Sequence, residues 1–122
     1  MILTNNEIYA RARQLMSAFQ DGEQRLPIKI NFYLQKNKNT LLALAQDIEA
    51  ARLQIAQTYG ELDESGEHFQ IPADKLAEAS KELDDLFGLE QDVTIHKINI
   101  DNLSDDLTLT TAQMEALMFM ID

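Results

Sequence analysis

Between residues 27 and 59 the chain places apolar side chains at alternating steps of four and three. This spacing puts one apolar face along a helix. It predicts a helix over residues 27–59, roughly 50 Å long, with Pro27 suited to its first position. The apolar face forms a heptad seam of the coiled-coil type, with these members: Ile30, Leu34, Asn37, Leu41, Leu44, Ile48, Ala51, Ile55 and Thr58.

Four further side chains widen this predicted face: Ile28, Leu42, Ala45 and Leu53. The long helix therefore needs more apolar cover than the helix before it supplies, and a second copy of the chain is one source. Asn37 interrupts the seam. A polar residue there costs stability but can fix the register and number of subunits. Alternatively, the helix reaches the surface in the polar stretch 35–40, and the sequence leaves both interpretations open.

Caps and stops predict three shorter helices. Thr4 and Glu7 have capping-box spacing, so the first helix begins at Thr4 and runs towards a stop at Gly22. Another helix begins at Pro72 and ends near residue 87. The last begins at Thr110 or Thr111, because a glutamine follows three residues after Thr110 in a second capping box.

Two segments have the pattern of strands. Residues 61–71 predict a small hairpin or an irregular excursion around a Ser-Gly turn. Residues 92–100 alternate apolar and polar side chains with one slip in parity, which predicts a strand with a bulge or twist, or a strand partly covered on both faces. A strand needs a partner, either residues 69–71 or a strand of a second copy. The predicted fold of the single domain 1–122 is mainly α with a small β element (α+β): an antiparallel helical hairpin with a long second helix, short strands and a C-terminal helix.

The last helix carries five consecutive apolar residues, 117–121, which cannot all lie on one helix face. Burial against the long helix or against a neighbouring subunit would protect them. The seam and this segment together predict a homo-oligomer interface, with these residues: Asn37, Leu41, Leu44, Ile48, Leu117, Met118, Phe119 and Ile121.

Charge and composition narrow the choice of partners. The 122 residues carry a net charge of −11, which argues against a general nucleic-acid binder. Residues 1–59 carry +2 and residues 60–122 carry −13, so the halves suit complementary faces within or between chains. The chain has no cysteine, which excludes thiol catalysis and cysteine-bound zinc. Neither a membrane span nor a signal peptide is expected.

One cluster of residue types suits an anionic or nucleotide ligand. Basic side chains are interleaved with aromatic rings that can stack on bases, with these members: Arg11, Arg13, Lys29, Phe32, Tyr33 and Lys36. The alternative is that these positive charges face the acidic half of the same or a neighbouring molecule.

Carboxylates and histidines suggest weaker candidates. Glu78, Glu82 and Asp85 share one helix face, as in helical magnesium-dependent nucleotide hydrolases, although a solvated acidic face is the simpler interpretation. His68 and His96 lie on or beside predicted strands, without a third ligand of suitable spacing. Residues 101–106 are predicted to form a turn and not a calcium loop. We therefore expect no catalytic residue, metal or cofactor.

Three segments, taken in order, resemble a family of small uncharacterised proteins of tailed phages and prophages. They are the run from Leu26 to Asn37 that leads into the long helix, the strand-like Val93–His96, and the closing Leu109–Leu117. The resemblance implies no catalytic residues. It implies a viral origin and a place in the cytoplasm of the bacterial host or in the virion.

The sequence thus favours a non-enzymatic phage or prophage protein that acts through self-assembly and protein binding, with another phage or host protein as a further partner. The alternative is a binder that sequesters a small ligand or a host signalling nucleotide. A magnesium-dependent nucleotide hydrolase is the third hypothesis.

Overall fold

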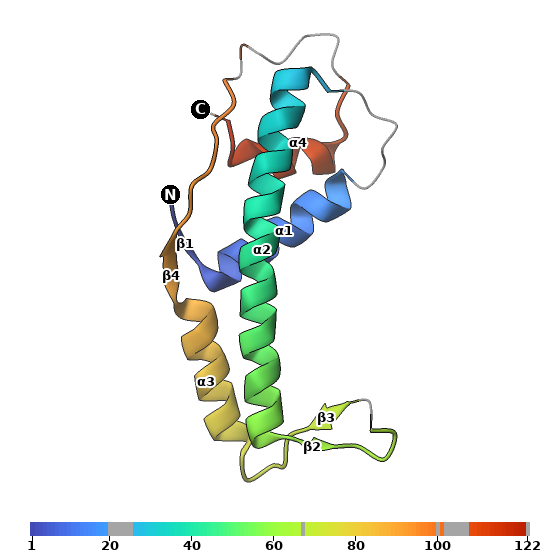
Figure 1. Ribbon diagram of the computed structural model, residues 1–122, viewed down its shortest axis with the longest axis vertical. Helices are drawn as coiled ribbons and strands as arrows, with labels where there is room; N and C mark the ends of the chain where they lie inside the picture. Colours follow the sequence, from blue (N-terminus) through green and yellow to red (C-terminus); the bar gives the residue numbers. More distant parts are fainter. Residues whose placement is uncertain (20–25, 67, 100, 102–107, 122) are drawn as a thin grey trace.

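A computed structural model describes residues 1–19, 26–66, 68–99, 101 and 108–121. Figure 1 shows the order of the elements, which is β1 (Ile2–Thr4), α1 (Asn5–Ala18), α2 (Ile28–Tyr59), β2 (Glu61–Leu62), β3 (Phe69–Gln70), α3 (Leu76–Gly88), β4 (Glu90–Asp92) and α4 (Thr111–Met118). The prediction of a mainly α fold with a small β element is confirmed.

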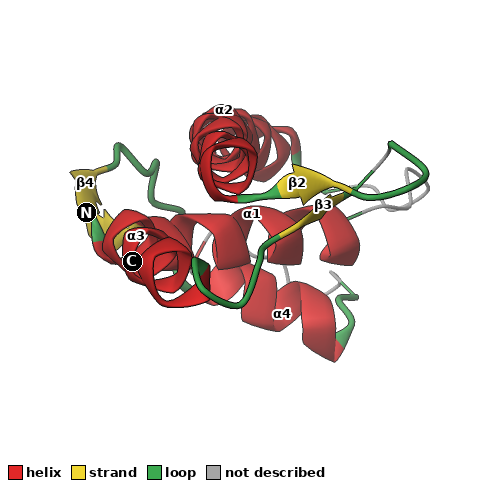
Figure 2. Cartoon of the chain, turned by 90° about the horizontal axis from the view of Figure 1, so that it is seen from below, coloured by secondary structure: helices red, strands yellow, loops and turns green. Residues whose placement is uncertain are grey.

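The helix α2 runs along the long axis of the molecule, and α1 crosses it obliquely (Figure 1). Seen from below, α1 lies between α2 and α4, and α3 lies beside α1 (Figure 2). Pro27 is the N-cap of α2 and not its first helical residue. The seam is the buried face of α2, because Ile30, Leu34, Leu41 and Ile48 all belong to the apolar core.

Two of the residues expected to widen that face lie elsewhere. The side chains of Ile28 and Leu53 are 88% and 44% exposed. Successive helix positions are about 100° apart, so both residues lie opposite the seam. Leu42 and Ala45, in contrast, are partly buried against the core, as expected.

Both capping boxes are confirmed. Thr4 accepts a hydrogen bond from the Glu7 amide and caps α1, and Thr110 accepts one from the Gln113 amide and caps α4. The predicted stop at Gly22 lies outside the described residues. α3 begins at Leu76, later than the predicted Pro72, since residues 73–75 form a turn.

The predicted hairpin is confirmed as well. β2 pairs antiparallel with β3, with Leu62 opposite Phe69. Gly66 has a φ of 72°, in the left-handed region that favours glycine. The hairpin lies at the C-terminal end of α2, away from both chain termini (Figure 1).

The predicted strand over residues 92–100 is wrong for most of its length. The strand β4 covers only Glu90–Asp92, and its partner is the N-terminal strand β1, with Leu3 opposite Gln91. Beyond β4 the chain continues beside α2 without a strand ladder (Figure 1). Its backbone amides bond instead to the two ends of the chain, Val93 to the Met1 carbonyl and Ile98 to the Met120 carbonyl.

The C-terminal helix packs chiefly against α1, where the long helix or a second subunit had been expected. Leu117 and Met120 are buried in the core. The Gln113 side chain donates a hydrogen bond of 3.0 Å to the Ala18 carbonyl at the end of α1. Leu117 and Met120 are thus covered within a single molecule.

Candidate functional site

Most of the predicted interface residues are covered by their own chain. Asn37, Leu41, Ile48 and Leu117 are buried, and Leu44, Phe119 and Ile121 are half-buried. Of the eight, Met118 alone is freely exposed, at 64%. The structure therefore places the four buried side chains in the core, where they leave no surface for a second copy.

Asn37 has a different role from either interpretation of the sequence. Its Nδ2 group donates a hydrogen bond of 2.9 Å to the His96 carbonyl, and its Oδ1 accepts one of 2.8 Å from the His96 amide. The same Nδ2 group also donates to Sδ of Met120. The side chain therefore acts as a neighbouring strand would, because it pairs both backbone groups of one residue in the extended segment after β4.

The predicted ligand cluster does not assemble into one pocket. On α1, the Arg11 guanidinium lies 5.0 Å from the Phe119 ring centre and that of Arg13 lies 5.9 Å from the Tyr9 ring centre. On α2, Tyr33 turns inward and stacks on His96, with 7° between the ring planes. Lys29 is exposed at the start of α2. The structure thus separates the two arginines from the remaining members.

Phe32 and Lys36 do remain together. The Lys36 Nζ atom lies 5.1 Å from the centre of the Phe32 ring, a cation–π distance. The Phe32 side chain is 56% exposed. A large ring and a cation thus face solvent one turn apart on α2.

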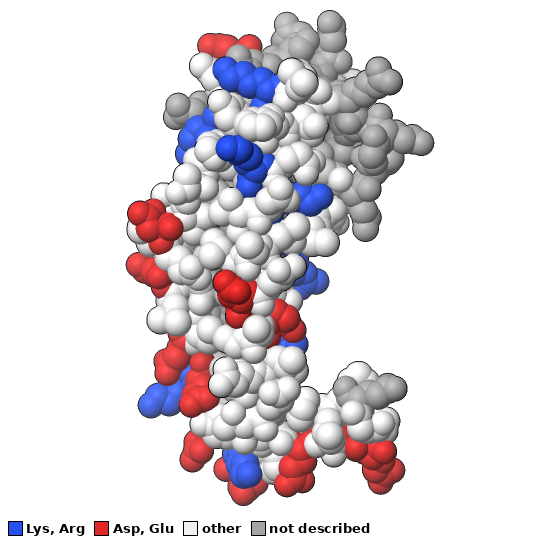
Figure 3. Space-filling model, viewed as in Figure 1, with Lys and Arg blue, Asp and Glu red and all other residues white. Residues whose placement is uncertain are grey.

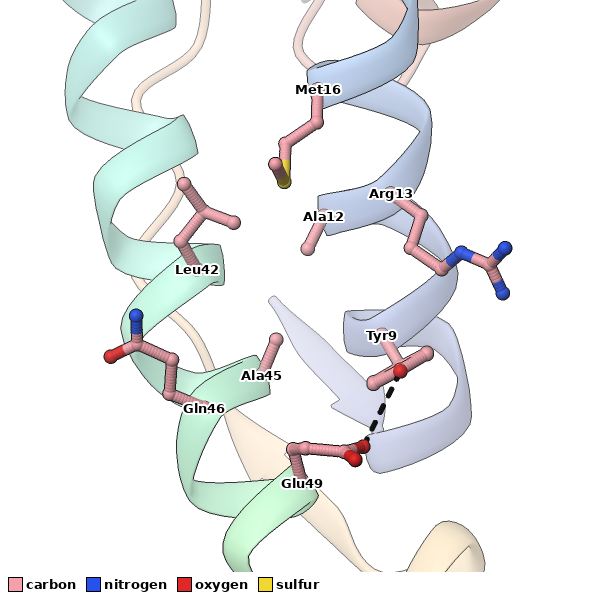
Figure 4. A pocket seen from close by; sticks show the side chains of 8 residues that line it. All are labelled: Tyr9, Ala12, Arg13, Met16, Leu42, Ala45, Gln46 and Glu49. Carbon is pink, nitrogen blue, oxygen red and sulfur yellow. Dashed lines mark hydrogen bonds between the residues drawn. The ribbon is translucent and has the colours of Figure 1, made fainter. Parts of the chain in front are cut away.

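An apolar groove lies between α1 and α2 (Figure 4). It has a volume of about 170 Å³, and its lining residues are Tyr9, Ala12, Arg13, Met16, Leu42, Ala45, Gln46 and Glu49. The Tyr9 hydroxyl donates a hydrogen bond of 3.4 Å to Glu49 across its lower part (Figure 4). Arg52 donates to the same carboxylate and holds the pKa of Glu49 below its ordinary value.

The carboxylates of α3 are exposed and do not form a metal site. Glu78, Glu82 and Asp85 all face solvent. A hydrogen bond to Glu82, together with burial and the negative charge of Glu78, raises the pKa of Tyr59. In the part of the chain that the structure describes, no group of three or more histidine, cysteine or acidic side chains could hold a metal ion.

The two histidines are far apart. His68 is exposed between β2 and β3, beyond the end of α2, and His96 contacts Tyr33 and Asn37 near the opposite end. From Asn37 to Tyr59 the helix rises about 33 Å, so the histidines do not share a site. Of the predicted turn over residues 101–106, only Asp101 belongs to the described residues.

The outward face of α2 is the most unusual surface of the molecule. Nine exposed residues recur there at helical steps of three and four and include no charged side chain, although a quarter of the chain is charged. We define them as the outer stripe: Ile28, Phe32, Gln35, Asn39, Ala43, Gln46, Ala50, Leu53 and Gln57. The solvent face of a helix normally carries charged side chains, so this composition is typical of a helix face that packs against protein.

The charged side chains beside the stripe change from basic to acidic along the axis of α2. The N-terminal half of α2 has Lys29, Lys36 and Lys38. The first acidic residue of α2 is Asp47, in its C-terminal half. The lower half of the molecule carries the acidic α3. Figure 3 shows this face, with basic side chains mainly towards one end and acidic ones mainly towards the other.

No family model, curated protein or solved structure matches the chain. Among the described residues, none of the helices is both long and apolar enough to cross a membrane.

The sequence analysis missed most of the outer stripe. Four of its nine members are amides, which interrupt the apolar pattern, so the search for apolar periodicity found only the opposite face. The signal that could have revealed it is the absence of charge at these nine helical positions.

Proposed function

We propose that this is a non-enzymatic protein that acts through self-assembly and through binding of another protein, and that it is a phage or prophage protein of the host cytoplasm or the virion. One observation supports self-assembly above all: a stripe of nine exposed residues along the longest helix has no charged member and includes Ile28, Phe32 and Leu53. The viral assignment is based on the resemblance of residues 26–37, 93–96 and 109–117 to that family.

The physical argument is the cost of leaving such a face in water. Burial of apolar surface contributes about 25 cal/mol per Å². Patches of exposed apolar side chains often mark protein interfaces. Aromatic residues such as Phe32 are enriched in protein–protein interfaces relative to the rest of the surface.

Light scattering after gel filtration tests the proposed self-assembly. We expect a mass that is a multiple of 13.9 kDa and that falls on dilution. A mass of one chain at the highest attainable concentration would contradict it.

Phe32 and Lys36 support a second candidate, the sequestration of a small anionic ligand such as a nucleotide. An exposed ring can stack on a base while the adjacent cation attracts a phosphate. A thermal-shift assay with cyclic nucleotides at millimolar concentration tests it, with Lys36→Ala as the comparison. A shift in the wild type that the variant loses would support this candidate, and no shift would contradict it.

A further inference from the structure

We propose that the outer stripe is the contact between two copies of the chain, which pair antiparallel along α2. This inference rests on the self-assembly proposed above and specifies its geometry. Its occupant is a second copy, because the stripe is complementary to itself when one copy is reversed.

The register follows from the positions of the large side chains. The stripe extends from Ile28 to Gln57, so its midpoint lies between residues 42 and 43. Reversal about that midpoint sets Phe32 opposite the partner's Leu53, and Gln35 opposite the partner's Ala50. Ala43 lies at the centre, where a small side chain lets two helix backbones approach closely. Phe32 and Leu53 thus meet at two places along the contact, whereas Ile28 lies opposite the partner's Gln57. The other amides and the alanines lie between the two Phe32–Leu53 contacts.

The charges beside the stripe favour the same arrangement. Lys36 and Asp47 are eleven residues apart, which places them within about 20° of each other around the helix and on one flank. In the antiparallel register Lys36 comes within one turn of the partner's Asp47, and this pairing occurs twice. A parallel two-fold pair would instead place this flank of the two copies on opposite sides of the contact, so Lys36 would not meet the partner's Asp47.

The uneven distribution of charge along the chain also favours the antiparallel arrangement. A net charge of −11 opposes association. The antiparallel arrangement sets the basic N-terminal half of α2 against the acidic half of the other copy (Figure 3). Figure 2 shows α2 on the outside of the molecule, with α1 and α4 both to one side of it.

Cross-linking tests the register directly. The chain has no cysteine, so each introduced thiol is unique. We expect an equimolar mixture of the Gln35→Cys and Ala50→Cys variants to form a disulfide-linked dimer under mild oxidation. Neither variant should cross-link with itself, since identical positions lie about 22 Å apart along the axis and a disulfide needs Cα atoms within about 7 Å.

The other outcomes overturn the inference in distinguishable ways. Self-cross-linking of Ala50→Cys would indicate parallel pairing. If light scattering gives a multiple of the chain mass and the mixture does not cross-link, self-assembly stands and the stripe is not its interface. If the protein is monomeric, both proposals fail.

Reversal of charge provides an independent test. We expect Lys36→Glu and Asp47→Lys each to raise the dissociation constant about tenfold, because each replaces two attractive pairs by two repulsive ones. The double variant should return to within about threefold of the wild type, since the pairs are restored in reversed order. Circular dichroism controls for folding. A double variant weaker than both single variants would overturn the antiparallel register.

Discussion

At the scale of single residues, Asn37 shows how one side chain can replace a strand. The extended segment after β4 has no ladder partner beside α2, so its backbone groups need other acceptors and donors. The Asn37 amide supplies one of each to His96. The sequence identified Asn37 as unusual because it interrupts the seam. It could not identify the partner, because the contact spans 59 residues of the chain.

Replacement of Asn37 tests this role. We expect Asn37→Ala to lower the free energy of unfolding by about 2–4 kcal/mol, because it leaves the amide and carbonyl of His96 without their partner. Asn31→Ala, on the same helix, exposed and outside the outer stripe, is the control and should change it by less than about 0.5 kcal/mol. Urea denaturation measures both. Equal effects of the two substitutions would contradict the role assigned to Asn37.

The contact between Arg52 and Glu49 predicts how the stability of the folded state depends on pH. The hydrogen bond from Arg52 lowers the pKa of Glu49, so the ionised form stabilises the folded state. This contribution is present above the ordinary carboxyl pKa and is lost as the pH falls through the lowered value. The pair is half exposed, so the effect stays below about 1 kcal/mol.

The check is the free energy of unfolding of the wild type and of Glu49→Gln between pH 7 and pH 3. We expect the difference between the two proteins to shrink as the pH falls. A difference that stays constant or grows towards pH 3 would contradict the assigned pair.

At the scale of elements, local signals predicted the helices and the β2–β3 hairpin but not the pairing of β1 with β4. A capping box involves residues three apart, so the starts of α1 and α4 could be found from the sequence. The strand β4 depends on β1, about 90 residues earlier, and no local pattern reports such a partner. The apolar positions over residues 92–100 instead reflected the burial of Val93 and Ile98 in the core.

The capping of α4 has a measurable effect. We expect Thr110→Ala to destabilise the protein by about 1 kcal/mol, because the Gln113 amide loses its acceptor. Thr111→Ala is the control, since Thr111 is exposed and makes no capping bond. Thermal unfolding compares the two variants. An equal decrease in melting temperature for both would show that the cap does not hold α4.

At the scale of the whole molecule, the two faces of α2 have separate roles. The seam faces the core of its own chain, and the outer stripe faces outward with charges of opposite sign towards its two ends. The sequence predicted self-assembly but placed the interface on the seam, because apolar residues alone defined the candidate face. The fold moves that candidate interface to the opposite side, where the amides and alanines lie.

The mass of the Phe32→Glu variant tests the central claim most directly. Phe32 faces solvent in the single chain and lies in the proposed interface, so a carboxylate there should prevent pairing without unfolding the chain. Met118→Glu is the matched control, because Met118 is an equally exposed apolar residue on α4. Light scattering over a range of concentrations measures all three proteins.

The account predicts a multiple of 13.9 kDa for the wild type and for Met118→Glu, and the mass of one chain for Phe32→Glu. If Phe32→Glu keeps the wild-type mass, or Met118→Glu loses it, the outer stripe is not the surface through which this protein assembles.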